Sequence, residues 1–215
     1  MSFQEVTIEL LKGFLTTILL FTTTFILSII LGALFAKLRM SKNKIISRIF
    51  QIFIWIIRGT PLMLQIIVIF YVPGLVFNIK GLNRVVAVIL ALTINYAVYF
   101  GEIYRSGLES IDKGQYDAAY SLGLSKRETF FKVIMLQVIK KSLPPLTNET
   151  ISLVKDTALA RVISVTEIIF AAQKITSTYA LIYVLFYTGI FYLAFNGILS
   201  IVFNKCEQKL SCIEA

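Results

Sequence analysis

The chain contains no histidine and only two cysteines among its 215 residues. Histidine is the commonest general base at neutral pH and a frequent zinc ligand, so its absence argues against hydrolytic and metal-centred chemistry. Cys206 and Cys212 lie near the C-terminus and lack the Cys-x-x-Cys spacing of redox or metal sites. We therefore expect two free thiols in a reducing compartment, no metal site and no catalytic residue.

Charged residues are also scarce, at 15% of the chain, whereas 57% of the residues are hydrophobic and the mean hydropathy is +0.81. Soluble domains are closer to one quarter charged, so this composition favours an all-α integral membrane protein. The net charge of +9 would suggest nucleic-acid binding in a soluble protein. In a membrane protein it instead raises the question of which loops carry the lysines and arginines, and we expect no nucleic-acid partner.

Five apolar stretches are long enough to cross a bilayer. A helix rises ~1.5 Å per residue, so about 20 apolar residues cover the ~30 Å hydrocarbon core. We group the five spans into one transmembrane domain over residues 1–215. The first span should remain as an anchor, because the segment before it does not read as a cleavable signal peptide. The predicted spans are 14–36, 49–77, 85–104, 146–173 and 178–203.

Lysine and arginine are distributed unevenly between the two sides of these spans. Five of them lie in residues 37–48, seven lie in 105–145, and two lie in the C-terminal tail. Four would face the opposite side, and three lie within spans. Because positive residues accumulate on the cytoplasmic side, we predict a multi-pass membrane protein with its N-terminus outside and its C-terminus in the cytoplasm.

The long polar loop, residues 105–145, carries signals for its own helices, since a loop of this length is rarely unstructured. Residues 115–122 favour a short helix that ends at Gly123, where a left-handed cap suits a residue without Cβ. Ser125 and Glu128 fit a capping box that begins a second helix. We expect that helix to end at Pro144-Pro145. Its apolar face comprises Phe130, Phe131, Ile134, Met135, Val138 and Ile139.

Two interpretations of this helix pair are open. The apolar face can lie flat on the membrane surface. Alternatively, two short helices set at an angle by Gly123 form a rigid knob that docks with a soluble partner.

One stretch of this loop, residues 114–125 (GQYDAAYSLGLS), followed by Leu143-Pro144-Pro145, resembles the EAA loop of binding-protein-dependent ATP-binding cassette (ABC) importer permeases. Asp117 stands where that family usually has glutamate. Five further segments resemble the polar amino acid branch, which includes histidine, arginine and glutamine permeases. They are 58–62 (RGTPL), 102–105 (EIYR), 113–115 (KGQ), 148–149 (NE) and 155–159 (KDTAL), in which Ala158 replaces the usual serine.

The resemblance implies a type I ABC importer permease fold in a bacterial inner membrane, with a cytoplasmic coupling helix that sits in a groove of a separate ATPase. The chain lacks a Gly-x-x-x-x-Gly-Lys-Ser/Thr phosphate loop, so ATP and Mg would be bound by that partner, and this chain would be neither an enzyme nor a cofactor-binding protein. A second permease subunit, identical or related, and an external substrate-binding protein are also implied. The expected coupling residues are Gly114, Gln115, Tyr116, Asp117, Ala118, Ala119 and Gly123.

Placing a charged side chain inside a membrane span costs at least ~2.5 kcal/mol of insertion free energy. The charged residues within the predicted spans should therefore face the protein interior or a water-filled cavity. They include Arg58, Glu149, Lys155 and Asp156. The fourth span is too long for one straight crossing, and we expect it to break at Lys155-Asp156-Thr157. Glu149 and Asp156 lie two helical turns apart, so they point the same way at different depths. They are candidates for binding the ammonium and a second positive group of a basic amino acid such as arginine, lysine or histidine.

Each candidate also has a structural interpretation. The two acids can form ion pairs with Arg58, Lys155 or Arg161, and then a neutral amino acid such as glutamine is the alternative substrate. Pro61 can simply kink the second span, or the kink can expose Thr60 and Arg58 to cargo. The other substrate candidates are Gln65 and Asn95, which can instead bond helix to helix, and Glu102, which can pair with Arg105 or Arg58.

Two rival functions follow from the same residues. Buried carboxylates are also typical of ion-gradient-driven secondary transporters, although such a transporter leaves the capped loop helices unexplained. A scaffold that transports nothing would use the same charges only as ion pairs. The preferred prediction is an importer subunit that works by alternating access.

Overall fold

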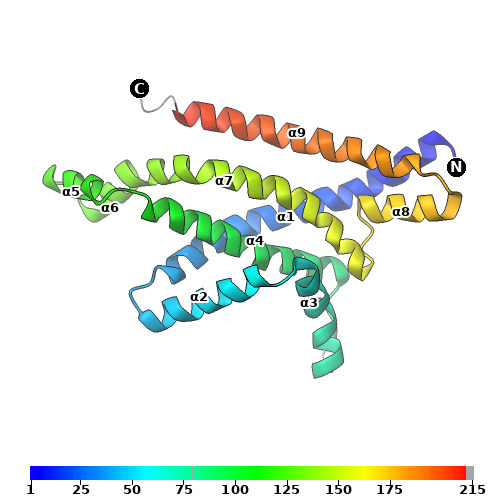
Figure 1. Cartoon of the computed structure of the whole chain (residues 1–215), viewed down its shortest axis with the longest axis horizontal. Coiled ribbons are helices and arrows are strands. Elements are labelled where there is room, and N and C mark those ends of the chain that lie inside the picture. Colours follow the sequence, from blue (N-terminus) through cyan, green and yellow to red (C-terminus); the bar gives the residue numbers. More distant parts are fainter. Residues whose placement is uncertain (79, 212–215) are drawn as a thin grey trace.

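The computed structural model describes residues 1–78 and 80–211, and every regular element in these residues is helical. The all-α prediction is thus confirmed. Long helices run side by side along the molecule, with α1 against α4, α4 against α7 and α7 against α9 (Figure 1). Their bounds are α1 (Phe3–Arg39), α4 (Arg84–Glu109), α7 (Met135–Asp156) and α9 (Tyr183–Ser211).

Shorter elements connect the long helices. The pair α5 and α6 lies at one end of the molecule, and the N-terminus and α8 lie at the other (Figure 1). The C-terminal end of α9 lies at the same end as α5. These connecting elements are α2 (Lys44–Gly59), α3 (Leu62–Phe77), α5 (Lys113–Ser121), α6 (Lys126–Glu128), the π-helical turn η1 (Thr129–Ile134), the 3-10 helix η2 (Thr157–Ile163) and α8 (Ile168–Tyr179).

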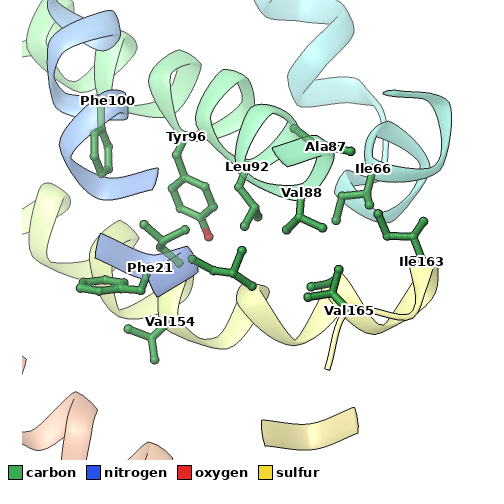
Figure 2. Close-up of a cluster of buried hydrophobic side chains, with 14 residues drawn as sticks. Phe21, Ile66, Ala87, Val88, Leu92, Tyr96, Phe100, Val154, Ile163 and Val165 are labelled. Atoms are coloured by element: carbon green, nitrogen blue, oxygen red, sulfur yellow. The ribbon is translucent and has the colours of Figure 1, made fainter. Parts of the chain in front are cut away.

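The centre of the bundle is an apolar cluster that joins α1, α3, α4, α7 and η2 (Figure 2). Small residues let α1 and α4 approach closely, because a Cβ at Gly32 would lie 2.9 Å from the Phe100 Cβ, and one at Gly101 would lie 3.0 Å from the Gly32 oxygen. Ser28 adds a hydrogen bond to the Thr93 oxygen at 3.3 Å. Small and hydroxyl residues at the crossing are typical of helix pairs inside membranes.

Three helices of the described chain are long and apolar enough to span a membrane, namely α1, α4 and α9. Helices α1 and α4 contain the predicted spans 14–36 and 85–104. Helix α9 covers the predicted span 178–203 only from Tyr183 onward, because residues 178–179 belong to α8 and 180–182 form the turn between the two helices. The pair α2 and α3 passes the same test together, with a bend of 106° between them, so residues 49–77 form two helices at a steep angle rather than one kinked span. The crossing predicted for 146–173 stays a prediction.

The expected break in the fourth span is present. Helix α7 ends at Asp156, the chain continues as η2, and Ser164 adopts a left-handed conformation before α8 begins. Leu153 and Val154 are buried beside the break, so this irregular backbone packs against protein, as backbone inside a membrane requires.

The prediction that Pro144-Pro145 ends the second loop helix was wrong, because α7 continues through both prolines to Asp156. Proline removes a backbone donor, but neighbouring helices and hydroxyl side chains can compensate inside a bundle. Helix α7 packs between α4 and α9, and these contacts on both sides accompany its helical course through the two prolines.

The predicted single helix after Ser125 also differs from the structure, because it is interrupted by η1. The extra residue of a π turn rotates the apolar face, so Ile134 is buried whereas Phe131 is 53% exposed. The six-residue apolar face is therefore split between the molecule's interior and its surface.

Candidate functional site

The bend between α2 and α3 is held by side-chain bonds to its free carbonyls. Thr60 is extended and Pro61 precedes α3 without a backbone N–H, so the end of α2 needs other donors. The Gln65 amide donates to the Ile57 oxygen at 2.9 Å and to the Thr60 hydroxyl at 3.0 Å. Asn95 of α4 then donates to the Gln65 oxygen at 3.0 Å.

Three predicted substrate residues, Thr60, Gln65 and Asn95, are thus brought together in one network. Asn95 is 5% exposed, and its amide is engaged with Gln65. The network is the helix-to-helix bonding that the sequence left open, and it fixes where α2 lies relative to α4.

Asp156, at the C-terminal end of α7, is half-buried and accepts a hydrogen bond from the Tyr96 hydroxyl of α4 at 2.7 Å. Figure 2 shows Tyr96 reaching from α4 toward α7. Within the described part of the chain, Asp156 forms no ion pair with Arg58, Lys155 or Arg161. In the structure the partner of Asp156 is therefore a tyrosine hydroxyl rather than one of the three cations considered in the sequence analysis.

Glu149 is half-buried on the same helix, and in residues 1–78 and 80–211 its carboxylate makes neither a hydrogen bond nor an ion pair. Asp156 and Arg58 both act electrostatically on it. Removing a carboxylate from water costs free energy when no partner replaces the lost hydration. The surroundings of Glu149 therefore suit a cationic ligand.

Arg58 lies over the ring of Tyr99, with its guanidinium carbon 5.4 Å from the ring centre. Both residues line a cavity of about 480 Å³ between α2, α4 and the end of α1. Glu102 also lines this cavity, and it pairs with Arg105 at 2.9 Å, one of the two partners expected for it. The remaining lining residues are Arg39, Gln51, Ile54, Trp55 and Gly59.

The seven predicted substrate residues therefore fall into two neighbouring groups. One is the network at the bend, and the other consists of the charged residues of α2, α4 and α7. Lys155 and Arg161 are exposed and belong to neither group.

Two aromatic residues, Tyr96 and Tyr99, were missed by the sequence analysis. Both sit in α4 within a mostly apolar run, where they read as ordinary packing residues. The signal that points to Tyr96 is its hydroxyl, since a buried tyrosine needs a hydrogen-bond partner, whereas Tyr99 is identified only by the position of Arg58 over its ring.

The predicted coupling element is built from caps at both ends of α5. At its start, the Asp112 carboxylate accepts from the Gly114 amide at 2.6 Å. At its end, Gly123 has φ of +77°, and the Leu124 amide donates to the Ala119 oxygen at 3.1 Å. The left-handed cap predicted at Gly123 is thus confirmed.

The side chains of α5 divide into a packed side and an outer side. Ala119 is buried and Tyr116 is half-buried, and Gln115 accepts a bond from Gln137 at 3.3 Å. On the outer side, Gly114, Asp117 and Ala118 are exposed. The helix is therefore held on one side and open to a partner on the other.

The capping box after Gly123 is also confirmed. The Glu128 amide donates to the Ser125 hydroxyl at 3.3 Å, and the Glu128 carboxylate accepts from the Ser125 amide at 3.1 Å. Lys132 pairs with Glu128 at 2.9 Å. The Lys132 ammonium and then the Ser125 donors lower the pKa of Glu128 from 4.5 to about 2.

Cys206 is exposed near the end of α9 and is a free thiol, as expected. The second expected thiol, Cys212, lies outside the described residues.

Comparison with known proteins gives results consistent with this architecture. The family model of binding-protein-dependent transport system inner membrane components matches residues 28–211. An L-cystine transport system permease of Bacillus subtilis strain 168 is 40% identical over 164 residues, 76% of this chain and 69% of that protein. A probable glutamine ABC transporter permease of the same organism is 37% identical over 211 residues, 96% of this chain and 95% of that one.

A solved structure described as an amino acid ABC transporter with histidines is similar across its length. Its TM-score is 0.86 at 30% sequence identity, and the match covers 95% of each chain.

Proposed function

Because the chain belongs to the family of binding-protein-dependent transport system inner membrane components, and is an amino-acid ABC importer permease, we propose that it moves polar amino acids into a bacterial cell by alternating access. The N-terminus is proposed to lie outside the cytoplasmic membrane and the C-terminus inside. ATP hydrolysis is assigned to a separate subunit, which would bind ATP and Mg.

The observation that carries this proposal is the pair α5–α6, held at one end of the bundle by caps at Asp112, Gly123 and Ser125. A rigid element with one exposed face can bind a soluble partner and pass the partner's movement on to the helices of the bundle. The residues proposed to contact the ATPase are those of the predicted coupling set. Ala119 and Tyr116 would act through packing, because they face inward.

For the substrate, we propose that Arg58 binds the α-carboxylate and Glu149 the α-ammonium. The two side chains come from α2 and α7 and carry opposite charges that act on each other. An arginine matches a carboxylate with paired donors, and Glu149 gains the cation that it lacks. Thr60, Gln65 and Asn95 would keep α2 in place, and Glu102 would line the approach beside Arg58.

The family implies a cytoplasmic ATPase and an external substrate-binding protein as partners. We further propose a second permease subunit, identical or closely related. Helices α2 and α3 leave large apolar side chains uncovered, including Trp55 at 74% and Leu75 at 79% exposure. Lipid or a second subunit would cover such surfaces.

The test is uptake by cells that lack their own amino acid importers and express the permease with its ATPase and binding protein. Uptake should stop when ATP is depleted and continue when an ionophore collapses the ion gradients. The opposite pattern would establish a secondary transporter instead.

Glu149→Gln provides the site test. Loss of a charge-assisted bond to the ammonium should raise the half-saturation concentration about tenfold or more, in line with the ~1.5–3 kcal/mol of such bonds. Glu9→Gln is the matched control, because that glutamate lies on the exposed start of α1 and pairs with Lys12. Equal half-saturation in the two variants would remove Glu149 from the site.

A further inference from the structure

The two carboxylates of α7 differ in how they are partnered. Asp156 accepts the Tyr96 hydroxyl at 2.7 Å, whereas Glu149 has no hydrogen bond or ion pair within the described residues. Seven residues of helix separate them by about 10 Å along the axis. A single extended amino acid whose ammonium sits at Glu149 can therefore direct its side chain toward Asp156.

The position of Tyr96 is fixed by packing. The residue is 2% exposed, and its ring lies 6.1 Å from the Phe100 ring and 6.4 Å from the Tyr99 ring. It is part of the apolar cluster between α1, α4 and α7 (Figure 2). The hydroxyl therefore cannot swing away from Asp156 without disturbing the core.

We propose that Tyr96 is a positioning residue that occupies Asp156, so that the permease prefers polar amino acids whose side chain carries no positive charge. This inference rests on the proposed function, in which Glu149 binds the α-ammonium. It narrows the substrate class from polar amino acids in general to those without a cationic side chain.

The physical reason is competition for one carboxylate. A hydroxyl bonded to a carboxylate at this distance forms a short charge-assisted bond and already provides Asp156 with a donor. Because the tyrosine hydroxyl donates to Oδ2 of Asp156, a guanidinium from the substrate cannot take both carboxylate oxygens in a paired bond, yet it must give up its own hydration. A neutral amide or hydroxyl side chain loses much less hydration free energy when it leaves water.

The decisive variant is Tyr96→Phe, which keeps the ring and removes only the hydroxyl. Asp156 then lacks a donor, and a basic substrate can supply one. We expect the ratio of arginine uptake to glutamine uptake to rise about tenfold, equivalent to about 1.4 kcal/mol. The measurement is competing uptake of radiolabelled glutamine and arginine in cells that express the complete transporter.

Two further variants isolate the effect. Tyr104→Phe makes the same change two turns along α4, where the hydroxyl has no hydrogen bond among the described residues, and it should leave the ratio as in the unmodified protein. Tyr96→Phe combined with Asp156→Asn should lose the gain for arginine, because no free carboxylate remains. A purely structural role of Tyr96 would lower the uptake of both substrates and leave their ratio unchanged.

The outcomes separate this inference from the proposed function. If the unmodified transporter takes up neither glutamine nor arginine nor any other amino acid, the proposed function fails. If it transports amino acids but prefers arginine, or if Tyr96→Phe leaves the ratio unchanged, the inference fails alone. If Tyr96→Phe does not accumulate in the membrane, the unmodified protein provides the test. Preferred uptake of glutamine supports the inference, and preferred uptake of arginine contradicts it.

Discussion

Some polar side chains inside this bundle form hydrogen bonds with other residues of the protein, and others do not. Asn95 and Gln65 bond to each other, and Asp156 is bonded to Tyr96. Within residues 1–78 and 80–211, Glu149 lacks such a bond. An unpaired half-buried charge lowers stability, and this is the reason for proposing that a substrate ammonium pairs with Glu149.

At the residue scale, Glu128 should respond to pH in a defined direction. Its folded-state pKa of about 2 lies below the ordinary value of 4.5, mainly because of the Lys132 ammonium. The cap therefore contributes fully above about pH 4.5, weakens as the pH falls, and is lost near pH 2. Titration of a labelled Glu128 carboxyl by NMR should give a midpoint near 2, and Lys132→Ala should raise that midpoint. A midpoint near 4.5 in the unmodified protein would contradict the observed pairing.

At the element scale, the α5–α6 pair depends on one backbone conformation. Gly123 adopts φ of +77°, which proline cannot reach because its ring fixes φ near −65°. Gly123→Pro should therefore deform the turn and uncouple ATP hydrolysis from uptake while the protein still inserts into the membrane. The measurement is the number of ATP molecules hydrolysed per amino acid transported.

Gly123→Asn is the matched control, because asparagine tolerates the left-handed region better than other residues with a side chain. It should keep most of the coupling. Normal coupling in Gly123→Pro would show that the turn does not transmit the motion.

The contact between α1 and α4 depends on two glycines, Gly32 and Gly101. A Cβ at position 32 would lie 2.9 Å from the Phe100 Cβ and 3.1 Å from the Gly101 nitrogen. Since one of these atoms belongs to the α4 backbone, relief requires the helices to separate. Gly32→Ala should lower the free energy of unfolding by about 1–3 kcal/mol, measured by thermal unfolding in one detergent.

Gly197 of α9 provides the comparison, because no atom lies within 4 Å of a Cβ placed there. Gly197→Ala should leave stability unchanged or raise it by about 0.5–1 kcal/mol through helix propensity. Equal melting temperatures for the two variants would mean that the helices do not meet at Gly32.

At the scale of the whole molecule, we expect the two ends of the fold to lie on opposite sides of the membrane. The N-terminus and α8 lie at one end, and α5, α6 and the end of α9 lie at the other (Figure 1). The excess of lysine and arginine in residues 37–48 and 105–145 predicts that the second end is cytoplasmic.

This orientation is testable with single cysteines in a background in which Cys206 and Cys212 are serine. Leu122→Cys, at a position 82% exposed beside Gly123, should react with a membrane-impermeant maleimide only after the cells are opened. Phe3→Cys, at a position 61% exposed at the start of α1, should react in intact cells. The reverse pattern would overturn the topology and, with it, the coupling role of α5.

The amino-acid sequence by itself determined the features that depend on neighbouring residues. Hydrophobic length predicted the membrane helices, Gly123 and the Ser125–Glu128 pair predicted the caps, and Pro61 and Asp156 marked the breaks. Each follows from the backbone geometry of a few consecutive positions. The sequence also selected the polar positions of the candidate site, since charges in apolar runs are conspicuous.

Only the tertiary structure decided which of these positions meet. Tyr96 and Asp156 are separated by 60 residues, and Gln65 and Asn95 by 30, so their bonds depend on how α3, α4 and α7 pack. The continuation of α7 through Pro144-Pro145 also lies beyond local sequence, since in the tertiary structure this helix packs between α4 and α9. Periodicity identifies the face that a helix buries, but partners on that face are chosen by contacts between distant segments.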